Sequence, residues 1–579
     1  MGEKSGQGKK SNGQRKEFPM EARMLIAFIL MGAVLFLMPY FYKPAAPPKD
    51  AAKDAPRAAT TAVTPAATRA PAAPAAESTS KPPAQAAIPV AGDKEELVKI
   101  ETSRFVVMFS SRGAVITSWA LKDYKSGDRK PLELVNTQGL QKVSRPFSYY
   151  FKDQKPAVDL NQALHAARRS EDGLGVEFEF SDGQVSARKS FRFGKDSYLI
   201  QVVSQVTAGG ATLSHGLAWQ GGFGDAAVEN AAASQRAVYF DATSGSLETK
   251  EAKEAKDGPV TFGGNFLFAG LEDAYFAAVF MSAGNRLDLT VFSHTVARAP
   301  NAAEEPHVGA AVGGEGRNEF SLFVGPKDMD LLRRVNPKLE RLIDFGWFAF
   351  IARPLFLGLN WLNDRYVHNY GWSIVVVTII INFALLPLKL TSMKSMKRMQ
   401  ALQPQVAALN EKYKGISMRD PRKAQQNQEL MDLYKKHGIN PMGGCVPMLL
   451  QIPFFIAFYK VLTVAIELRG AEWLWVKDLS APEHLPIRIL PVAMLVSQFV
   501  MQKLTPTTTA DPAQQRIMML MPLMLGFMFY GVSSGLVLYW LTGNLVGIAQ
   551  QLIINRLSPP VPVAQAVPAP SKSKKPVRK

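Results

Sequence analysis

The sequence predicts a multi-domain membrane protein in which six α-helical spans accompany a large all-β domain outside the membrane. Two observations carry this prediction. From Leu97 to Val324, apolar and polar residues alternate with the period of two that half-buried strands show. After residue 370 the chain carries five apolar stretches, and a further stretch, Met24–Tyr42, lies near the N-terminus. The first region therefore predicts sheet, and the second predicts helices in lipid.

Composition limits the classes of function that the chain can have. The 579 residues are 47% hydrophobic and 20% charged, and the formal net charge is +18. Basic residues gather at both ends and in one loop, which fits contact with anionic lipid better than a DNA-binding face. The single cysteine, Cys445, excludes an intrachain disulfide and a cysteine zinc cluster. The P-loop string of ATP-driven pumps is missing from the sequence. We expect no cofactor, no metal site and no DNA partner.

The N-terminal region predicts an anchor followed by a tether. Residues 1–23 are polar and basic, and Met24–Tyr42 is uncharged and close to the about 20 residues that a span needs. This run exceeds a normal signal-peptide core and is not closed by a clear A-x-A cleavage site. We therefore favour a retained signal-anchor over a cleaved signal peptide. Residues 43–92 are rich in Ala and Pro and predict an extended linker.

The region 93–330 predicts a large antiparallel sandwich. Val176–Phe180 and Phe191–Phe193 alternate between apolar and polar residues, and Asp182-Gly183 marks a hairpin turn between them. Tyr198–Val203 is so rich in β-formers that we expect a strand buried on both faces. A dozen or more such runs are expected in this region.

The region 331–368 predicts an amphipathic helix at the bilayer surface. It is aromatic but carries Arg341, Arg353 and Arg365, so charge interrupts it too often for it to span. The five expected spans that follow are 369–391, 444–466, 485–504, 516–532 and 534–555.

Charge predicts the topology. Six spans place both termini on one side of the membrane. The basic N-terminus, the basic 392–443 loop and the basic tail 556–579 all fall on that side, which the positive-inside rule makes cytoplasmic. The β domain is then periplasmic. We expect the 392–443 loop to form a helical hairpin that turns near Gly415–Asp420, and the tail to contact ribosomal RNA or anionic lipid.

Several strings in the C-terminal part carry a family resemblance. They are Gln403-Pro404, Asn440–Pro447, Leu450–Phe454, Glu467–Arg469, Gln502–Pro506 and Ser534–Trp540. In this order, and behind a long β domain with one N-terminal span, they resemble the Gram-negative branch of the YidC-type membrane protein insertases over about residues 340–558. The resemblance implies a β-supersandwich similar to sugar mutarotases, a five-helix insertase core and no catalytic chemistry. It also implies a protein of the cell inner membrane that inserts and folds nascent membrane proteins, alone or with the Sec translocon.

One position departs from this family. Its members usually carry an arginine in the second span, and Asn382 stands at the matching place in Tyr370–Asn382. A charged side chain in that position cannot be carried over to this chain.

Polar residues inside the apolar stretches are the candidate site. We expect a hydrated substrate groove lined by Thr378, Asn382, Gln451, Gln498, Tyr539 and Trp540. Ser497, Asn544 and Gln550 are further candidate lining residues. Thr378 and Asn382 are four residues apart and share one helix face. The alternative interpretation is interhelical hydrogen bonding that holds the bundle together, at about 0.6 kcal/mol per contact.

A second candidate surface and two other functions complete the predictions. Met393, Met396 and Met399 form one face of the hairpin, which either contacts substrate or lipid or packs against membrane helices. The alternative functions are a small-solute transporter and a membrane-anchored carbohydrate-binding protein. The spans show no internal repeat of the kind that transporters have. The sequence shows no motif around the histidines of the β region, which favours surface or core positions over catalysis: His165, His215, His294 and His307.

Overall fold

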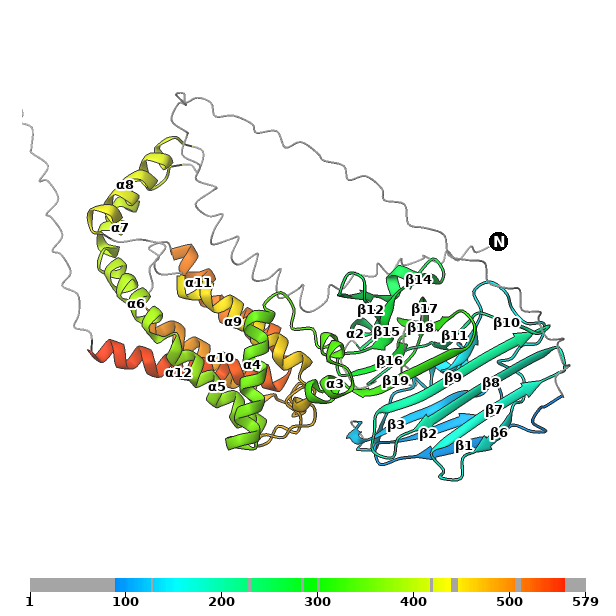
Figure 1. The fold of residues 1–579 in the computed structure, drawn as a ribbon. Helices are drawn as coiled ribbons and strands as arrows, with labels where there is room; N and C mark the ends of the chain where they lie inside the picture. The colour runs from blue at the N-terminus through cyan, green and yellow to red at the C-terminus, as the bar shows by residue number, and fades with distance from the viewer. Residues whose placement is uncertain are drawn as a thin grey trace, which may run out of the picture. The chain divides into compact units, whose positions relative to one another are not determined.

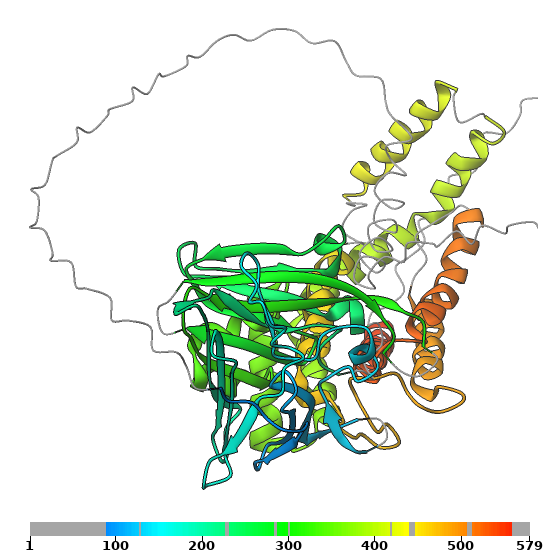
Figure 2. The same cartoon turned by 90° about the vertical axis from the view of Figure 1, so that its right-hand side faces the viewer.

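The computed structural model describes residues 89–126, 129–225, 231–282, 286–298, 302–416, 420–438, 446–505 and 512–557. The expected signal-anchor, nearly all of the linker and the tail after Leu557 lie outside these residues. The chain divides into two compact units. One holds residues 83–396 and 442–560, and the other includes residues 397–441. Figures 1 and 2 show the strands, coloured blue to green, followed along the chain by the helices, coloured green to red.

The β domain consists of three antiparallel sheets within the described residues. The ten-stranded sheet has the order β13 (Ser246–Lys250), β12 (Arg236–Asp241), β15 (Phe266–Glu272), β16 (Phe276–Ser282), β19 (Asn318–Pro326), β9 (Leu199–Ala208), β8 (Val185–Phe193), β7 (Gly175–Ser181) and β6 (Ala166–Arg169), with β10 (Ala211–Thr212) beside β9. The five-stranded sheet has the order β14 (Val260–Gly264), β17 (Leu287–Val296), β18 (Glu305–Gly314), β11 (His215–Trp219) and β5 (Ser148–Tyr150). The four-stranded sheet has the order β1 (Leu97–Glu101), β2 (Phe105–Ser110), β3 (Val115–Lys125) and β4 (Pro131–Glu133).

An aromatic cluster forms the core where the sheets meet. Trp119 on β3 lies 6.1 Å from Trp219 on β11, between ring centroids, and Phe109 on β2 lies 4.9 Å from Phe191 on β8. Phe147, just before β5, contacts Phe191 edge-on at 5.5 Å. Buried aromatic pairs of this kind add to the hydrophobic gain of the sandwich. The predicted all-β sandwich is confirmed by the three sheets and by this core.

Two local predictions in the β region, a turn and a buried strand, have different outcomes. Asp182-Gly183 turns β7 into β8, because Gly183 adopts a φ of 93° and the Asp182 carboxylate accepts hydrogen bonds from the amides of Gln184 and Val185. The expectation that Tyr198–Val203 is buried on both faces is wrong. Burial alternates along β9, and Gln201 is exposed, where its amide donates to the Ser321 hydroxyl at 3.0 Å.

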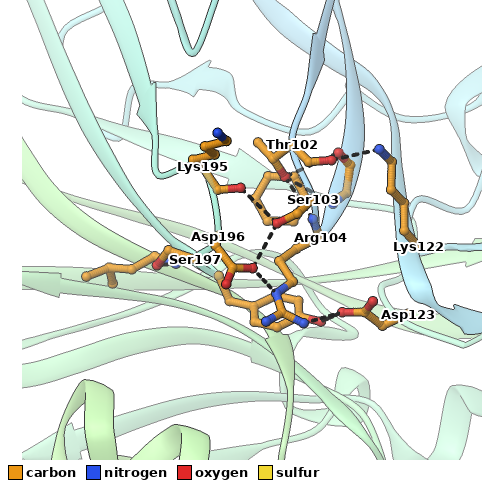
Figure 3. A network of polar contacts seen from close by, with 11 residues as sticks. Thr102, Ser103, Arg104, Lys122, Asp123, Lys195, Asp196 and Ser197 are labelled. Atoms are coloured by element: carbon orange, nitrogen blue, oxygen red, sulfur yellow. Dashed lines mark hydrogen bonds and ion pairs between the residues drawn. The ribbon is translucent and has the colours of Figure 1, made fainter.

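A surface network joins the four-stranded sheet to the ten-stranded sheet (Figure 3). Arg104, in the turn after β1, pairs with Asp123 on β3 at 3.0 Å and with Asp196, in the turn before β9, at 2.7 Å. Ser103 donates a hydrogen bond to the Asp196 carboxylate at 2.8 Å. Exposed pairs contribute about 0–1 kcal/mol each, so this network fixes the register of the turns more than it stabilises the domain.

The segment expected to form one interfacial helix is divided into several. The helices here are α3 (Met329–Val335), η3 (Pro337–Leu342), α4 (Ala349–Leu362) and η4 (Asn363–Val367). The axis then bends by 118° into α5 (Tyr370–Ala384). His368 lies in the left-handed region at the bend, and the Asn369 side chain caps α5 by accepting from the Trp372 amide. Trp347 is 97% exposed and Phe350 74%, as expected for aromatic side chains that face a lipid surface.

The later helices are α6 (Leu386–Ala401), α7 (Gln403–Lys412), α8 (Arg422–Lys436), α9 (Val446–Val464), η6 (Ile466–Leu468), α10 (Ile489–Leu504), α11 (Pro512–Phe529) and α12 (Ser534–Leu557). The expected second span therefore comprises α5 and the start of α6, which are separated at Leu385. Pro387 lacks an amide donor, and it occupies the first turn of α6, where none is needed. Pro404 similarly occupies the first turn of α7.

By length and composition, α12 alone among the described helices is long and apolar enough to cross a membrane. The bent pair α4–η4 and α5 passes the same test when taken together. Shorter apolar helices are Gln451–Val464, α10 and Met519–Phe529. The count of six spans stays a prediction, because Met24–Tyr42 lies outside the described residues.

Candidate functional site

The candidate site is a polar cluster where α12 packs against both α5 and α10 (Figure 1). Glycine on α12 makes this packing close. A Cβ at Gly547 would lie 2.1 Å from the Met501 methyl group on α10, so the end of the Met501 side chain would have to shift to admit a larger residue. A Cβ at Gly543 would lie 3.9 Å from the Asn382 amide nitrogen on α5. The close helix contact therefore brings polar side chains of three helices together.

Thr378 and Asn382 bond mainly within their own helix. The Thr378 hydroxyl, which is fully buried, donates to the Ile374 carbonyl at 2.6 Å. The Asn382 amide nitrogen donates to the Thr378 carbonyl at 2.9 Å. Both donors are thus satisfied one turn back along α5, a common arrangement for such residues inside helices. These donors do not cross to another helix.

Lys389 on α6 completes the polar surface around Asn382. Its ammonium nitrogen Nζ donates to the Asn382 Oδ1 at 2.6 Å, and its side chain is half-buried. Seven residues separate the two positions, which is about two helical turns, so they share a face despite the break at Leu385. Sequence reasoning did not identify Lys389. The spacing of seven from Asn382 was the signal that could have found it.

Side chains of α10 and α12 extend the cluster. The Asn544 amide donates to the Ser497 hydroxyl at 3.0 Å, which joins α12 to α10. The Gln550 amide nitrogen donates to the Asn382 backbone carbonyl at 3.3 Å, which joins α12 to α5. The other polar atom of Gln550, Oε1, is buried and has no hydrogen-bond partner within the described residues. A buried acceptor without a donor is costly, so Gln550 Oε1 leaves this cluster with one unsatisfied polar atom.

The remaining predicted groove residues lie elsewhere. The Trp540 indole donates to the Gln498 side chain at 3.3 Å, and its ring packs against Phe455 at 4.9 Å. Tyr539 is buried and stacks on Phe458 at 4.3 Å. Gln451 is exposed on α9. The structure therefore brings Thr378 and Asn382 together, pairs Gln498 with Trp540, and places Tyr539 in aromatic packing.

The methionines of the second candidate surface differ in burial. Met393 and Met396 on α6 are half-buried, and Met399 is buried. Whether this face contacts substrate stays a prediction.

The charge of the helical bundle has one sign. The helices α5, α6, α9, α10, α11 and α12 contain no Asp or Glu in their sequences. Arg353 on α4 pairs with Glu340 at 2.8 Å and is about half exposed. It therefore faces a carboxylate rather than the polar cluster, and Lys389 is the cation that contacts Asn382.

A second polar group lies just after α9. Glu467 on η6 accepts a hydrogen bond from Asn360 on α4 at 3.3 Å, and its burial raises its pKa to about 7. Arg469 follows and pairs with Asp225 of the β domain at 2.6 Å. These contacts connect α4 and the β domain to the end of α9.

Three histidines of the β domain, His165, His215 and His307, are buried core residues, and His294 is half-buried. The Ser204 hydroxyl lies 2.8 Å from the His215 ring nitrogen Nε2, and His307 contacts Gln235 at 2.9 Å. Burial lowers the pKa of His165, His215 and His307 to about 4, so all three are neutral at pH 7. Among the described residues, no group of His, Cys, Asp or Glu could hold a metal ion.

Comparison with known proteins covers nearly the whole chain. Residues 361–560 match the sequence family "60Kd inner membrane protein", and residues 97–357 match the "YidC periplasmic domain". The membrane protein insertase YidC of Syntrophus aciditrophicus is 34% identical over 93% of this chain and 100% of its own length. That of Geotalea uraniireducens is 35% identical over the same shares.

Solved structures are more distant. The crystal structure of an active YidC insertase with the first transmembrane domain resolved is 18% identical, with a TM-score of 0.34, and covers 80% of this chain and 93% of that one. A galactose mutarotase-like protein from Lactobacillus casei is 12% identical, with a TM-score of 0.27, and covers 40% of this chain and 100% of that one.

Proposed function

This chain belongs to the YidC family of membrane protein insertases, and on this premise we propose that its substrates cross the membrane along the polar surface around Asn382. The family places the protein in the inner membrane, with a periplasmic domain and with nascent membrane proteins as substrates. The protein is not an enzyme. Insertion needs a path that lowers the free energy of a polar segment within hydrocarbon.

The single observation that carries this proposal is which groups accept the hydrogen bonds that the Thr378 and Asn382 side chains donate. If these residues served to hold helices together, their side chains would donate to neighbouring helices. Both donate instead to α5 itself, and the Asn382 acceptor faces Lys389. Within the described residues, neither side chain therefore donates a hydrogen bond that links α5 to α9, α10, α11 or α12. Asn544 and Ser497 do link α12 to α10, and for them the packing interpretation is favoured.

The proposed mechanism is passive. A charged group at mid-bilayer costs about 2.5–3.5 kcal/mol on insertion scales, and hydrogen bonds from a polar surface with its water offset part of that cost. The polar flank of the substrate passes along this surface. Its apolar segment then moves into lipid, driven by the hydrophobic effect.

The topology and the partners belong to the same proposal. With Met24–Tyr42 as a sixth span, the termini and the 392–443 hairpin are cytoplasmic. Lipid contact at the start of α4 is supported by the exposure of Phe350 on this helix and of Trp347 just before it. The Sec translocon and the ribosome are further partners that we propose on family grounds. A solute transporter or a carbohydrate-binding protein is not favoured, because the full-length relatives are insertases.

The test is an insertion assay in cells depleted of their own insertase and supplied with this chain. Protease protection of newly made inner-membrane proteins reports the translocated segments. We expect Asn382→Leu to reduce insertion of substrates with long polar translocated segments more than insertion of substrates with short ones. Asn544→Leu is the matched control, and it should affect both substrates alike. Equal losses in the two classes for Asn382→Leu would favour the packing interpretation.

A further inference from the structure

The residue at the family's arginine position has a charged neighbour. Asn382 Oδ1 accepts a hydrogen bond from the Lys389 ammonium at 2.6 Å. Lys389 comes from the next helix, α6, about two turns further along the chain. Its flexible stem therefore carries a positive charge back to the place where the span itself carries an amide.

The orientation of the Asn382 amide is fixed by its two partners. Its nitrogen donates to the Thr378 carbonyl, which can only accept. Its oxygen must then face Lys389, since an ammonium can only donate. This arrangement leaves one orientation of the amide that satisfies both contacts. Asn382 thus holds the ammonium against the α5–α12 surface, where Gln550 contacts the Asn382 carbonyl.

The described helices of the bundle offer Lys389 no counter-charge. The helices α5, α6, α9, α10, α11 and α12 carry no acidic residue. No carboxylate among the described residues forms an ion pair with Lys389, whose hydrogen bond to Asn382 uses one of three ammonium donors. A half-buried cation without a counter-charge attracts an anion that comes close.

We propose that Lys389 supplies the positive charge of the substrate path in this chain, and that Asn382 is its positioning residue. The anion that it recognises is an Asp or Glu side chain in the translocated polar segment of a nascent membrane protein. This inference rests on the proposed polar path. It assigns the charge to a different helix from the one that carries it in most of the family.

The test compares two reporter substrates in depleted cells that express the full-length chain. Both are single-span proteins with a short translocated N-terminal tail, and the tails differ only by two Asp residues in one and two Asn residues in the other. Protease protection gives the ratio of acidic-tail to neutral-tail insertion. We expect Lys389→Met to lower this ratio on the order of tenfold. This change lies between the changes expected from the attraction of two unit charges about 4 Å apart in water and at a partly buried site.

Three further variants complete the test. Lys389→Arg should keep the ratio, and Asn382→Arg combined with Lys389→Met should restore it, because the charge returns from α5. Lys394→Met is the matched control, since Lys394 is an exposed lysine on the same helix, and it should leave the ratio unchanged. The level of protein in the membrane and insertion of the neutral tail report whether each variant folds.

Two results would overturn the inference. If Lys389→Met lowers both substrates equally, the lysine is an anchor to lipid head groups. If the double variant does not restore the ratio, charge at this position is not what the substrate senses. Failure of the underlying path is distinguishable, because Asn382→Leu would then leave insertion of long neutral polar segments unchanged.

Discussion

Asp225→Asn is expected to loosen the contact between the β domain and the segment after α9. Asp225 Oδ2 lies 2.6 Å from Arg469 Nη2, and the two side chains are 2% and 10% exposed. Arg469 also donates to the Lys125 carbonyl at 2.8 Å. Removing one partner of a buried pair costs about 3–5 kcal/mol, because the other charge stays buried without compensation. Asparagine keeps a neutral acceptor, so we expect about 3 kcal/mol.

Native-state hydrogen exchange of the full chain in lipid nanodiscs measures this loss locally, which avoids assuming two-state unfolding of a multi-domain protein. Since about 1.4 kcal/mol corresponds to a tenfold change, amides next to Asp225 and Arg469 should exchange roughly a hundredfold faster. Asp288→Asn is the matched control, because Asp288 pairs with Arg286 at 4.0 Å on the exposed surface. It should change exchange by less than about 1 kcal/mol. An Asp225→Asn effect no larger than this control would refute the reasoning.

Three other perturbations test the packing and the electrostatics of the described residues. Gly547→Leu should separate α12 from α10, because its side chain would occupy the place of the Met501 methyl group, and cysteine cross-linking between the two helices should fall. Gly183→Ala should destabilise the β7–β8 hairpin by about 1–2 kcal/mol, since its φ is 93°, and faster amide exchange in β7 would report this. Burial lowers the pKa of His165 and His215 to about 4, below the ordinary 6.5, so the unfolded chain binds more protons between these values. Stability of the β domain should therefore be full above about pH 6.5 and fall as the pH drops towards 4, by up to about 3 kcal/mol per histidine; protection from exchange that is unchanged between pH 7 and 4.5 would contradict this.

The sequence predicted most of the fold because its signals are local. Period-two alternation identified strands such as β7 and β8, and apolar runs identified α10 and α12 nearly to their ends. Tyr198–Val203 was misjudged because β-propensity does not say whether a second layer covers a face. The outer face of β9 is only partly covered, and Gln201 is exposed there.

The site was harder to predict because contacts between helices depend on how each helix is rotated. The amide at Asn382 was visible in the sequence, but its partner Lys389 lies beyond the helix break at Leu385. The expected span 369–391 placed that lysine at the membrane edge, where a basic side chain is expected to face lipid head groups. Tyr539 shows that membership of a family motif does not by itself place a side chain in the groove. It belongs to a family motif, yet its ring stacks on Phe458 inside the bundle.

The choice of lysine over arginine has a consequence for substrate release. A path must bind its cargo well enough to admit it and weakly enough to let it leave. An arginine holds a carboxylate through two parallel hydrogen bonds, whereas a lysine ammonium makes point-charge contacts on a flexible stem. Lys389→Arg should therefore preserve the preference for acidic tails but lengthen the time that such substrates spend at α5. Site-specific cross-linking of stalled and released acidic-tail substrates at Ile381 measures this residence. A dwell time that is the same with Lys389 and with Arg at this position would mean that the ammonium does not set the rate of release.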